Sequence, residues 1–185
     1  MRIIGGSARG LHLADVGAGD AKAHLRPTSD RVRESIFNLL INGGYGNPLQ
    51  GARVLDVFAG TGALGLEALS RGAASARFIE NGTAALALLK RNIALMRAEE
   101  RCDILRRDAC KPGLNPGAAF DVVFLDPPYG KAMGEVALAA LTPWLAPEAL
   151  VIWEESLPPI PPSGFAQMDQ RKYGDTLVTI LKAPA

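Results

Sequence analysis

The chain has 185 residues, 48% of them hydrophobic, and a formal net charge of +1. This size and apolar fraction are sufficient for one domain with a substantial core. The nearly balanced charge excludes a polybasic protein that coats nucleic acid, and no apolar run approaches a membrane span or a signal-peptide core. Two cysteines without zinc-site spacing form no disulfide framework, which is typical of a protein of the reducing cytoplasm.

The first 45 residues are expected to form an extension of the main domain. Residues 2–4 and 11–13 are strand-like and flank several glycines, a pattern that favours a tight hairpin. A polar stretch follows, and then Thr28, Ser29 or Asp30 can cap a helix that ends at a pair of glycines.

From residue 46 onward, strand-like and helix-like segments alternate, which predicts a mostly parallel sheet covered by helices on both faces. Strands are expected at residues 53–58, 75–80, 102–108, 120–126 and 149–155, and helices at residues 62–72, 83–98 and 133–145. Residues 164–182 contain two strand-like runs without a helix between them, so we expect an antiparallel hairpin at one sheet edge. The predicted fold class is α/β: a Rossmann-like domain over residues 46–185 with a seven-stranded sheet.

A glycine-rich turn joins the first of these strands to the following helix. Gly60, Gly62 and Gly65 match the GxGxxG pattern, and Glu80 lies 20 residues after Gly60. This spacing satisfies a dinucleotide-binding fingerprint, in which an acid holds the ribose hydroxyls. The simpler alternative is a tight strand-to-helix turn without a ligand, and the correctly spaced acid makes that alternative the less favoured one.

Acidic residues at three successive strand ends favour a different cofactor. Asp56 lies in the strand just before the glycine turn, where its carboxylate would repel a pyrophosphate and attract an ammonium group. S-adenosylmethionine carries an ammonium group and no phosphate, so the charge pattern predicts this cofactor. Glu80 would hold its ribose diol, and Asp108 would accept a hydrogen bond from its adenine amino group. A turn cap is the alternative role for Asp108.

The segment VVFLDPPYG, residues 122–130, ends a strand abruptly because Pro127 and Pro128 cannot continue the sheet pairing. It resembles the Asp/Asn/Ser-Pro-Pro-Tyr/Phe motif of methyltransferases that act on amino groups. The amine of a base is a poor nucleophile, and the Asp126 carboxylate and Pro127 carbonyl can each accept one of its N–H groups and orient its lone pair. Pro128 restricts the turn, and Tyr129 offers a face on which a base can stack. The alternative is a strand end that happens to carry an acid.

Several segments together give a narrower resemblance. The stretches LRPTSDRVRESIFN, DVFAGTGALGLEALSRGA and FLDPPYG occur in this order, and the chain resembles the RsmD family of bacterial methyltransferases over almost its whole length. The resemblance implies transfer of a methyl group from S-adenosylmethionine to N2 of a guanine in 16S ribosomal RNA of the small subunit. We also expect a cytoplasmic monomer that needs neither a metal nor a membrane.

The resemblance also assigns the site residues. By motif it implies an amine-binding site at Asp126, Pro127, Pro128 and Tyr129, a cofactor site at Asp56, Phe58, Gly60, Gly62, Glu80 and Asp108, and an N-terminal block near cofactor and RNA at Arg26, Thr28, Arg31 and Arg33. Residues 1–35 carry six basic and four acidic residues, which suits local phosphate contacts, although a solvated face is the alternative. Ala8, Leu11 and His12 depart from the tryptophan and basic residues common in relatives, so part of the RNA contact is expected to be weaker.

Two other functions stay open at this point. The same motif would suit another amine, either N6 of adenine in DNA or RNA or the amide of a protein glutamine. The Asp126 carboxylate favours guanine, whose N1–H and N2–H groups both donate, without excluding adenine. The second alternative is a domain that binds RNA or a nucleotide without catalysis, which the intact amine motif beside an intact cofactor turn disfavours.

Overall fold

The computed structural model describes residues 1–15 and 30–185. The helices are α1 (Asp30–Asn42), α2 (Ala63–Ser70), α3 (Thr83–Leu95) and α4 (Met133–Leu141), with short 3₁₀ segments η2 (Glu99–Arg101) and η3 (Thr142–Trp144). The strands are β1 (Arg53–Val57), β2 (Ser75–Ile79), β3 (Cys102–Leu105), β4 (Phe120–Leu125), β5 (Leu145–Glu155), β6 (Ala166–Tyr173) and β7 (Thr176–Lys182). Helix α4 is shorter than expected because Pro143 cannot continue an α-helix, and β5 begins correspondingly earlier.

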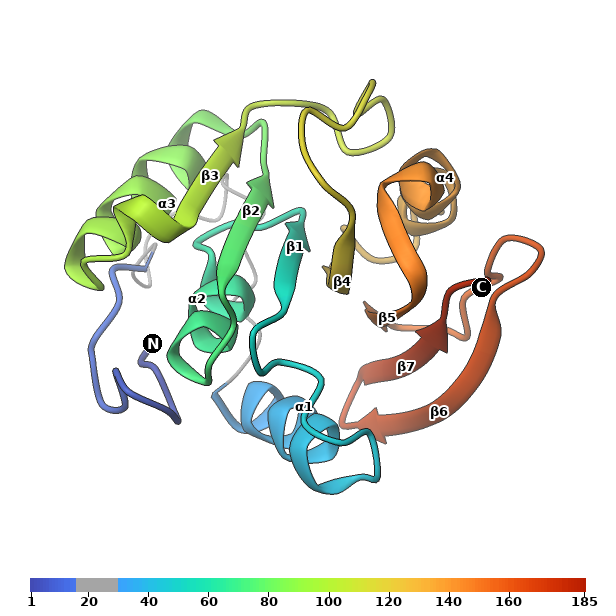
Figure 1. Cartoon of the computed structure of the whole chain (residues 1–185), viewed down its shortest axis with the longest axis horizontal. Coiled ribbons are helices and arrows are strands. Elements are labelled where there is room, and N and C mark those ends of the chain that lie inside the picture. The colour runs from blue at the N-terminus through green and yellow to red at the C-terminus, as the bar shows by residue number, and fades with distance from the viewer. Residues whose placement is uncertain (16–29) are drawn as a thin grey trace.

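Within the described residues, seven strands form one sheet in the order β3-β2-β1-β4-β5-β7-β6 (Figure 1). The pairs among β1 to β5 are parallel, whereas β7 is antiparallel to both β5 and β6. The predicted fold class, with its antiparallel C-terminal hairpin at one edge, is confirmed.

Alternate residues of the strands enter two cores, one on each face of the sheet. Val54 and Phe124 belong to the cluster that includes residues of α1, α2 and α3, whereas Leu55 and Val123 belong to the cluster that includes residues of α4. All four side chains are buried, as expected for parallel strands that are covered on both faces.

The N-terminal segment packs onto the first of these cores. Arg2 and His12 form an antiparallel bridge, and the Ile3 N–H donates to the Leu11 carbonyl over 2.9 Å, which closes the expected hairpin. Ile3 and Leu13 are buried in the same cluster as residues of α1 and β1. The core therefore runs across the expected boundary between the extension and the main domain, and the division into two parts stays a prediction.

Helix α1 ends where the glycine pair predicts. The Gly43 N–H donates to the Leu39 carbonyl over 2.8 Å, and Gly44 follows with a φ of +91°, a conformation that glycine adopts without strain. Of the three candidate caps, Asp30 is the first residue of the helix, and Thr28 and Ser29 lie outside the described residues.

The strand order reverses between β1 and β4. The helix after β1 packs on one face and the helix after β4 on the other, so a crevice opens at the carboxyl ends of these strands, which is the usual ligand site of an open α/β sheet. Asp56 in β1 and Asp126 after β4 both line this crevice. Among the described residues, no helix combines the length and the apolar character needed to cross a lipid bilayer.

Candidate active site

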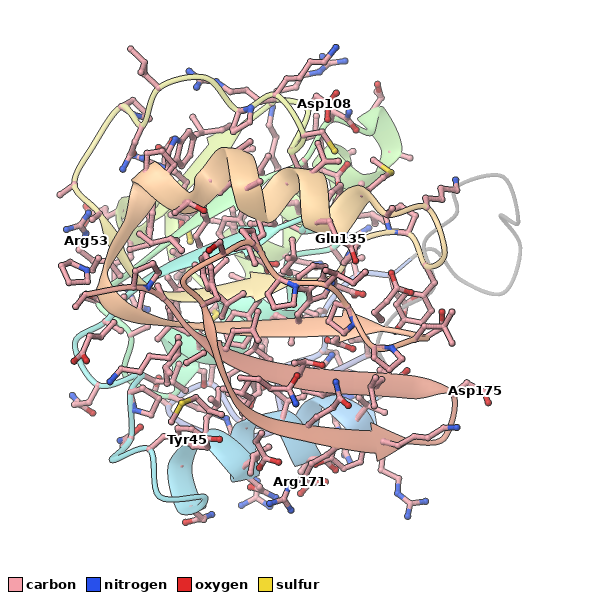
Figure 2. The ribbon with its side chains drawn as sticks, turned by 90° about the vertical axis from the view of Figure 1, so that its right-hand side faces the viewer. Tyr45, Arg53, Asp108, Glu135, Arg171 and Asp175 are labelled. Atoms are coloured by element: carbon pink, nitrogen blue, oxygen red, sulfur yellow. The ribbon has the colours of Figure 1, made fainter. Side chains whose placement is uncertain are left out.

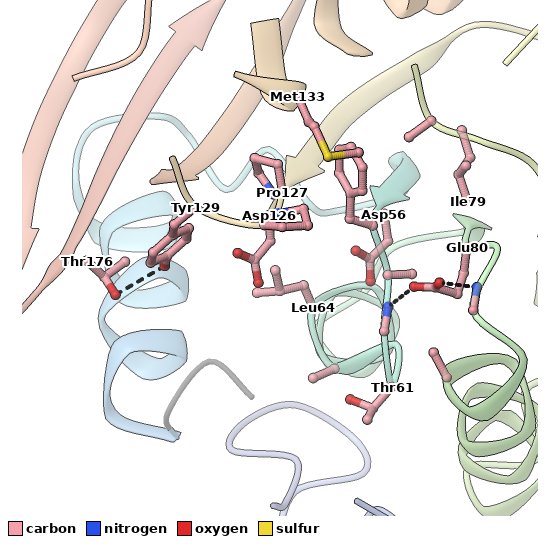
Figure 3. A pocket seen from close by; sticks show the side chains of 18 of the residues that line it. Asp56, Thr61, Leu64, Ile79, Glu80, Asp126, Pro127, Tyr129, Met133 and Thr176 are labelled. Atoms are coloured by element: carbon pink, nitrogen blue, oxygen red, sulfur yellow. Dashed lines mark hydrogen bonds between the residues drawn. The ribbon is translucent and has the colours of Figure 1, made fainter. Parts of the chain in front are cut away.

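A cavity of about 1280 Å³ opens at the crevice (Figure 3). All four residues of the amine motif line it, and so do all the predicted cofactor residues except Gly62. The volume exceeds the roughly 300–1,000 Å³ of an ordinary small-molecule site, so there is room for a second group beside a cofactor. The structure thus brings the two predicted sites into one cavity.

Asp56 lines the cavity and is itself buried. Its side chain is 2% exposed, and Oδ2 accepts a hydrogen bond of 2.8 Å from the Gly65 N–H in the first turn of α2. Burial raises the pKa of this carboxyl well above 3.8; the Gly65 N–H acts in the opposite direction, while the charges of Asp126 and Glu80 raise the pKa further. A cationic ligand group would therefore favour ionisation of Asp56, which fits the expected ammonium partner.

The turn after β1 has an unusual backbone. Phe58 has a φ of +60°, which costs a bulky residue about 1–3 kcal/mol and is characteristic of functional sites. Gly60 and Gly62 follow with φ of +55° and +79°. A Cβ atom at Gly62 would lie 2.4 Å from Leu89 Cδ1, so this glycine is required for close packing against α3. Gly62 shapes the turn, and Phe58 and Gly60 face the cavity.

Glu80 connects the end of β2 to the glycine turn. Its Oε2 accepts the Gly60 N–H over 2.8 Å, and its Oε1 accepts the N–H groups of Asn81 and Gly82 over 2.9 and 2.7 Å (Figure 3). A carboxylate has about four acceptor positions, so three of them are used within the protein. Glu80 can accept about one more hydrogen bond, which fits one hydroxyl of a ribose more readily than a bidentate grip on the diol.

Asp108 caps a turn and also lines the cavity. Its Oδ1 accepts the Cys110 N–H over 2.9 Å, which is the turn-capping interaction. The residue also lines the cavity, three residues after the end of β3, which stops at Leu105 and is shorter than predicted. Its contact with the adenine stays a prediction.

The amine motif is held from two sides. The Gly130 N–H donates to Glu155 Oε1 at the end of β5 over 3.2 Å, and the Tyr129 hydroxyl lies 3.3 Å from Thr176 Oγ1 at the start of β7. Figure 3 shows the Asp126 carboxylate between Tyr129 and Asp56. In this view Tyr129 lies on the side of the cavity away from Glu80, and Asp126 and Asp56 lie between them.

The structure separates the residues that were expected near RNA. Arg31 is exposed on α1 and lines the cavity, and Arg26 and Thr28 lie outside the described residues. Arg33 requires a correction, because its side chain is fully buried and cannot contact phosphate in this conformation. Its Nη2 donates to Asp30 Oδ1 over 2.9 Å and to the Arg2 carbonyl, and its Nε lies 3.9 Å from Glu67 Oε2.

A helical pattern could have revealed the burial of Arg33. The residue lies three, four and seven positions before Ile36, Phe37 and Leu40, all of which are buried. Positions with this spacing share one helix face, so an arginine among them needs an internal partner. Asp30 accepts a hydrogen bond from Arg33, and Glu67 forms an ion pair with Arg33 at 3.9 Å and accepts a hydrogen bond from Arg71 Nε over 2.7 Å.

Sequence reasoning also missed part of the cavity wall. Lys131 lies two residues after Tyr129 of the amine motif, and Lys172, Tyr173 and Thr176 come from the hairpin of β6 and β7. The position of Lys131 was a usable signal. The hairpin residues could be placed only once the strand order was known.

Comparison with known proteins identifies the relatives of this chain. The family model described as conserved hypothetical protein 95 matches residues 1–182. Ribosomal RNA small subunit methyltransferase D of Escherichia coli K12 is 40% identical over 167 residues, which cover 87% of this chain and 79% of that protein. The chain belongs to the RsmD family.

Other relatives agree in sequence and fold. The protein of the same name from Haemophilus influenzae is 34% identical over 183 residues, which cover 94% of this chain and 89% of that protein. The solved structure of the Escherichia coli protein yhhF superposes with a TM-score of 0.84 at 36% identity, covering 100% of this chain and 98% of that chain. The predicted membership of the RsmD family is thereby confirmed.

Proposed function

We propose that this protein transfers a methyl group from S-adenosylmethionine to the N2 amine of a guanine in 16S ribosomal RNA of the small subunit. The observation that carries the proposal is the single cavity that holds both the acidic cofactor residues and the amine motif. Membership of the RsmD family supports the reaction class, since the relatives are named as ribosomal RNA methyltransferases. We further propose that the enzyme acts as a monomer in the cytoplasm.

The acidic residues that line the cavity fit this cofactor. Asp56 offers a carboxylate to an ammonium group, and Glu80 offers one remaining acceptor position to a ribose hydroxyl. Asp108 lines the same wall and would accept from the adenine amino group. When bound, the cofactor supplies a methyl group on a positively charged sulfur, which is already an activated donor and needs no metal.

The amine motif orients the nucleophile. The Asp126 carboxylate and the Pro127 carbonyl each accept one N–H, which directs the nitrogen lone pair toward the methyl group. The nitrogen becomes positively charged as its bond to the methyl carbon forms and the carbon–sulfur bond breaks, with S-adenosylhomocysteine as the neutral leaving group. Its hydrogen bonds to Asp126 therefore strengthen toward the transition state. The nitrogen then releases one proton, and Asp126 need only guide that proton toward solvent. Alignment alone can contribute about 7–11 kcal/mol to such a transfer.

A guanine must leave its stack to reach this cavity. The Tyr129 ring offers a surface on which the base can stack, at a gain of about 1–3 kcal/mol. Arg31 lies on the wall of the same cavity, where it would contact the RNA backbone. The proposed RNA contact of Arg26 belongs to the same N-terminal block.

The test is methyl transfer to small ribosomal subunits isolated from cells that lack this protein, followed by mass analysis of the nucleosides. We expect one N2-methylguanosine in 16S RNA, and none with an Asp126→Ala protein that still binds the cofactor. Formation of N6-methyladenosine would replace the guanine assignment with an adenine one. Absence of any methylated nucleoside from subunits and from naked RNA would refute the proposed function.

A further inference from the structure

The turn between β6 and β7 lies at the binding edge of the sheet because β7 runs antiparallel to β5. Leu177 near the start of β7 pairs with Glu155 at the carboxyl end of β5. The start of β7 therefore lies at the edge where the parallel strands end. Figure 2 shows Asp175 at the tip of this hairpin, and the residues from 172 to 176 all line the cavity.

Thr176 holds the aromatic residue of the amine motif. Its Oγ1 lies 3.3 Å from the Tyr129 hydroxyl, and both side chains are partly buried (Figure 3). Glu155 holds the following residue, because its Oε1 accepts the Gly130 N–H. The loop that contains the motif is thus attached both to the end of β5 and to the hairpin. A hydrogen bond at the Tyr129 hydroxyl restricts the ring plane on which the target base would stack.

Three exposed cations also line the cavity. Arg31 comes from α1, Lys131 from the loop after the amine motif, and Lys172 from β6. Across residues 1–15 and 30–185, none of the three forms an ion pair. Asp175 is the acidic neighbour of Lys172 on the same turn. Exposed cations without carboxylate partners are suited to phosphate oxygens.

We infer that the turn from Lys172 to Thr176 is a substrate-positioning element: Thr176 fixes the plane of Tyr129 for the target base, and Lys172, together with Lys131, binds phosphates next to that nucleotide. This inference rests on the proposed function and adds to it which residues present the base. Thr176 acts through Tyr129 and is a positioning residue, whereas the two lysines contact the substrate directly.

The first test asks whether Thr176 affects methyl transfer through its contact with the Tyr129 hydroxyl. The single-turnover rate of methyl transfer to small subunits is measured at saturating cofactor for Thr176→Val, Thr176→Ser, Tyr129→Phe and the double variant Thr176→Val/Tyr129→Phe. Thr176→Val and Tyr129→Phe should each slow transfer about two- to tenfold, the range of a neutral hydrogen bond. The double variant should be no slower than either single variant, and Thr176→Ser, which keeps the hydroxyl, should retain the parental rate.

The second test concerns the lysines. Lys172→Glu and Lys131→Glu should raise the KM for small subunits and reduce the salt slope of log K by about 1 each, with the affinity for S-adenosylhomocysteine unchanged. Lys90→Glu makes the same charge change on an exposed position of α3 outside the cavity and serves as the matched control.

The outcomes distinguish this inference from the proposed function. If the parent protein methylates guanine while the Lys172, Lys131 and Thr176 variants all behave like Lys90→Glu, the inference is overturned and the proposed function stands. Additive losses in the double variant would also overturn the role of Thr176, because its effect would not pass through Tyr129. If the parent protein transfers no methyl group, the proposed function itself fails.

Discussion

The two halves of the cavity differ in how they are built. The cofactor half consists of strand ends that follow one another in the sequence, and its acids Asp56 and Glu80 are held by backbone N–H groups. The substrate half is assembled from α1, the loop after β4 and the hairpin of β6 and β7, and its cations are exposed. A small cofactor needs a preformed, largely buried site, whereas a large polyanion needs an accessible rim. One cavity can therefore serve two ligands through separable sets of residues.

The greatest loss of activity is expected from substitution of Asp126, which should slow methyl transfer without weakening cofactor binding. Asp126→Ala should slow single-turnover transfer by about 10²–10³-fold, the usual cost of removing one group that stabilises developing charge. Its affinity for S-adenosylhomocysteine, measured by calorimetry, should match the parent protein. Asp126→Asn keeps one acceptor and should retain part of the rate. A rate for Asp126→Ala equal to that of the parent would show that the motif is only a strand end.

Glu80 tests the cofactor half in the same way. Glu80→Ala removes a charged acceptor from the ligand and from the Gly60 N–H, so it should weaken binding of S-adenosylmethionine by about 1.5–3 kcal/mol. Glu80→Gln, which keeps an acceptor oxygen, should lose less. Calorimetry with NAD on the parent protein is the control and should show no binding. Tight NAD binding would overturn the cofactor assignment.

Arg33 and Arg31 were both predicted to contact RNA, but Arg31 is exposed at the substrate half and Arg33 is buried in the core. Arg33→Met should lower the free energy of unfolding by about 1–3 kcal/mol, because it removes the hydrogen bonds of Arg33 Nη2 and its ion pair with buried Glu67, which keeps Arg71 as its remaining arginine. Arg31→Glu should leave stability nearly unchanged and raise the KM for small subunits. Urea unfolding and steady-state kinetics distinguish the two. An Arg33→Met protein with parental stability would contradict the structural role.

Asp56 is expected to give the weakest effect, a dependence on pH. Its pKa in the folded protein is raised above 3.8 by burial, so the folded state retains a proton that the unfolded chain has lost. Stability should therefore fall as pH rises from 3.8 through the raised pKa, and cofactor affinity should rise over the same interval as Asp56 ionises. Asp56→Asn should flatten both profiles in urea unfolding and calorimetry. Unchanged profiles would mean that Asp56 does not titrate there.

The sequence predicted the cofactor half better than the substrate half, because the residues of the cofactor half lie closer together along the chain. Asp56, the glycine turn and Glu80 lie within one strand-helix-strand unit, so local spacing was enough to place them in one site. The contact between Tyr129 and Thr176 joins residues 47 positions apart, and it depends on the antiparallel direction of β7. The burial of Arg33 depends on Glu67 of another helix, although its place on the apolar face of α1 was visible in the sequence.

A paired measurement on Asp126→Ala and Glu80→Ala decides whether the two halves are separable. For each variant, the dissociation constant of S-adenosylhomocysteine and the single-turnover rate at saturating S-adenosylmethionine are determined on the same preparation with small ribosomal subunits. We expect a crossed pattern: Asp126→Ala keeps the affinity and loses the rate, whereas Glu80→Ala loses affinity and keeps most of the rate. If both variants lose affinity and rate together, the cavity is one undivided site and the division into a cofactor half and a substrate half is contradicted.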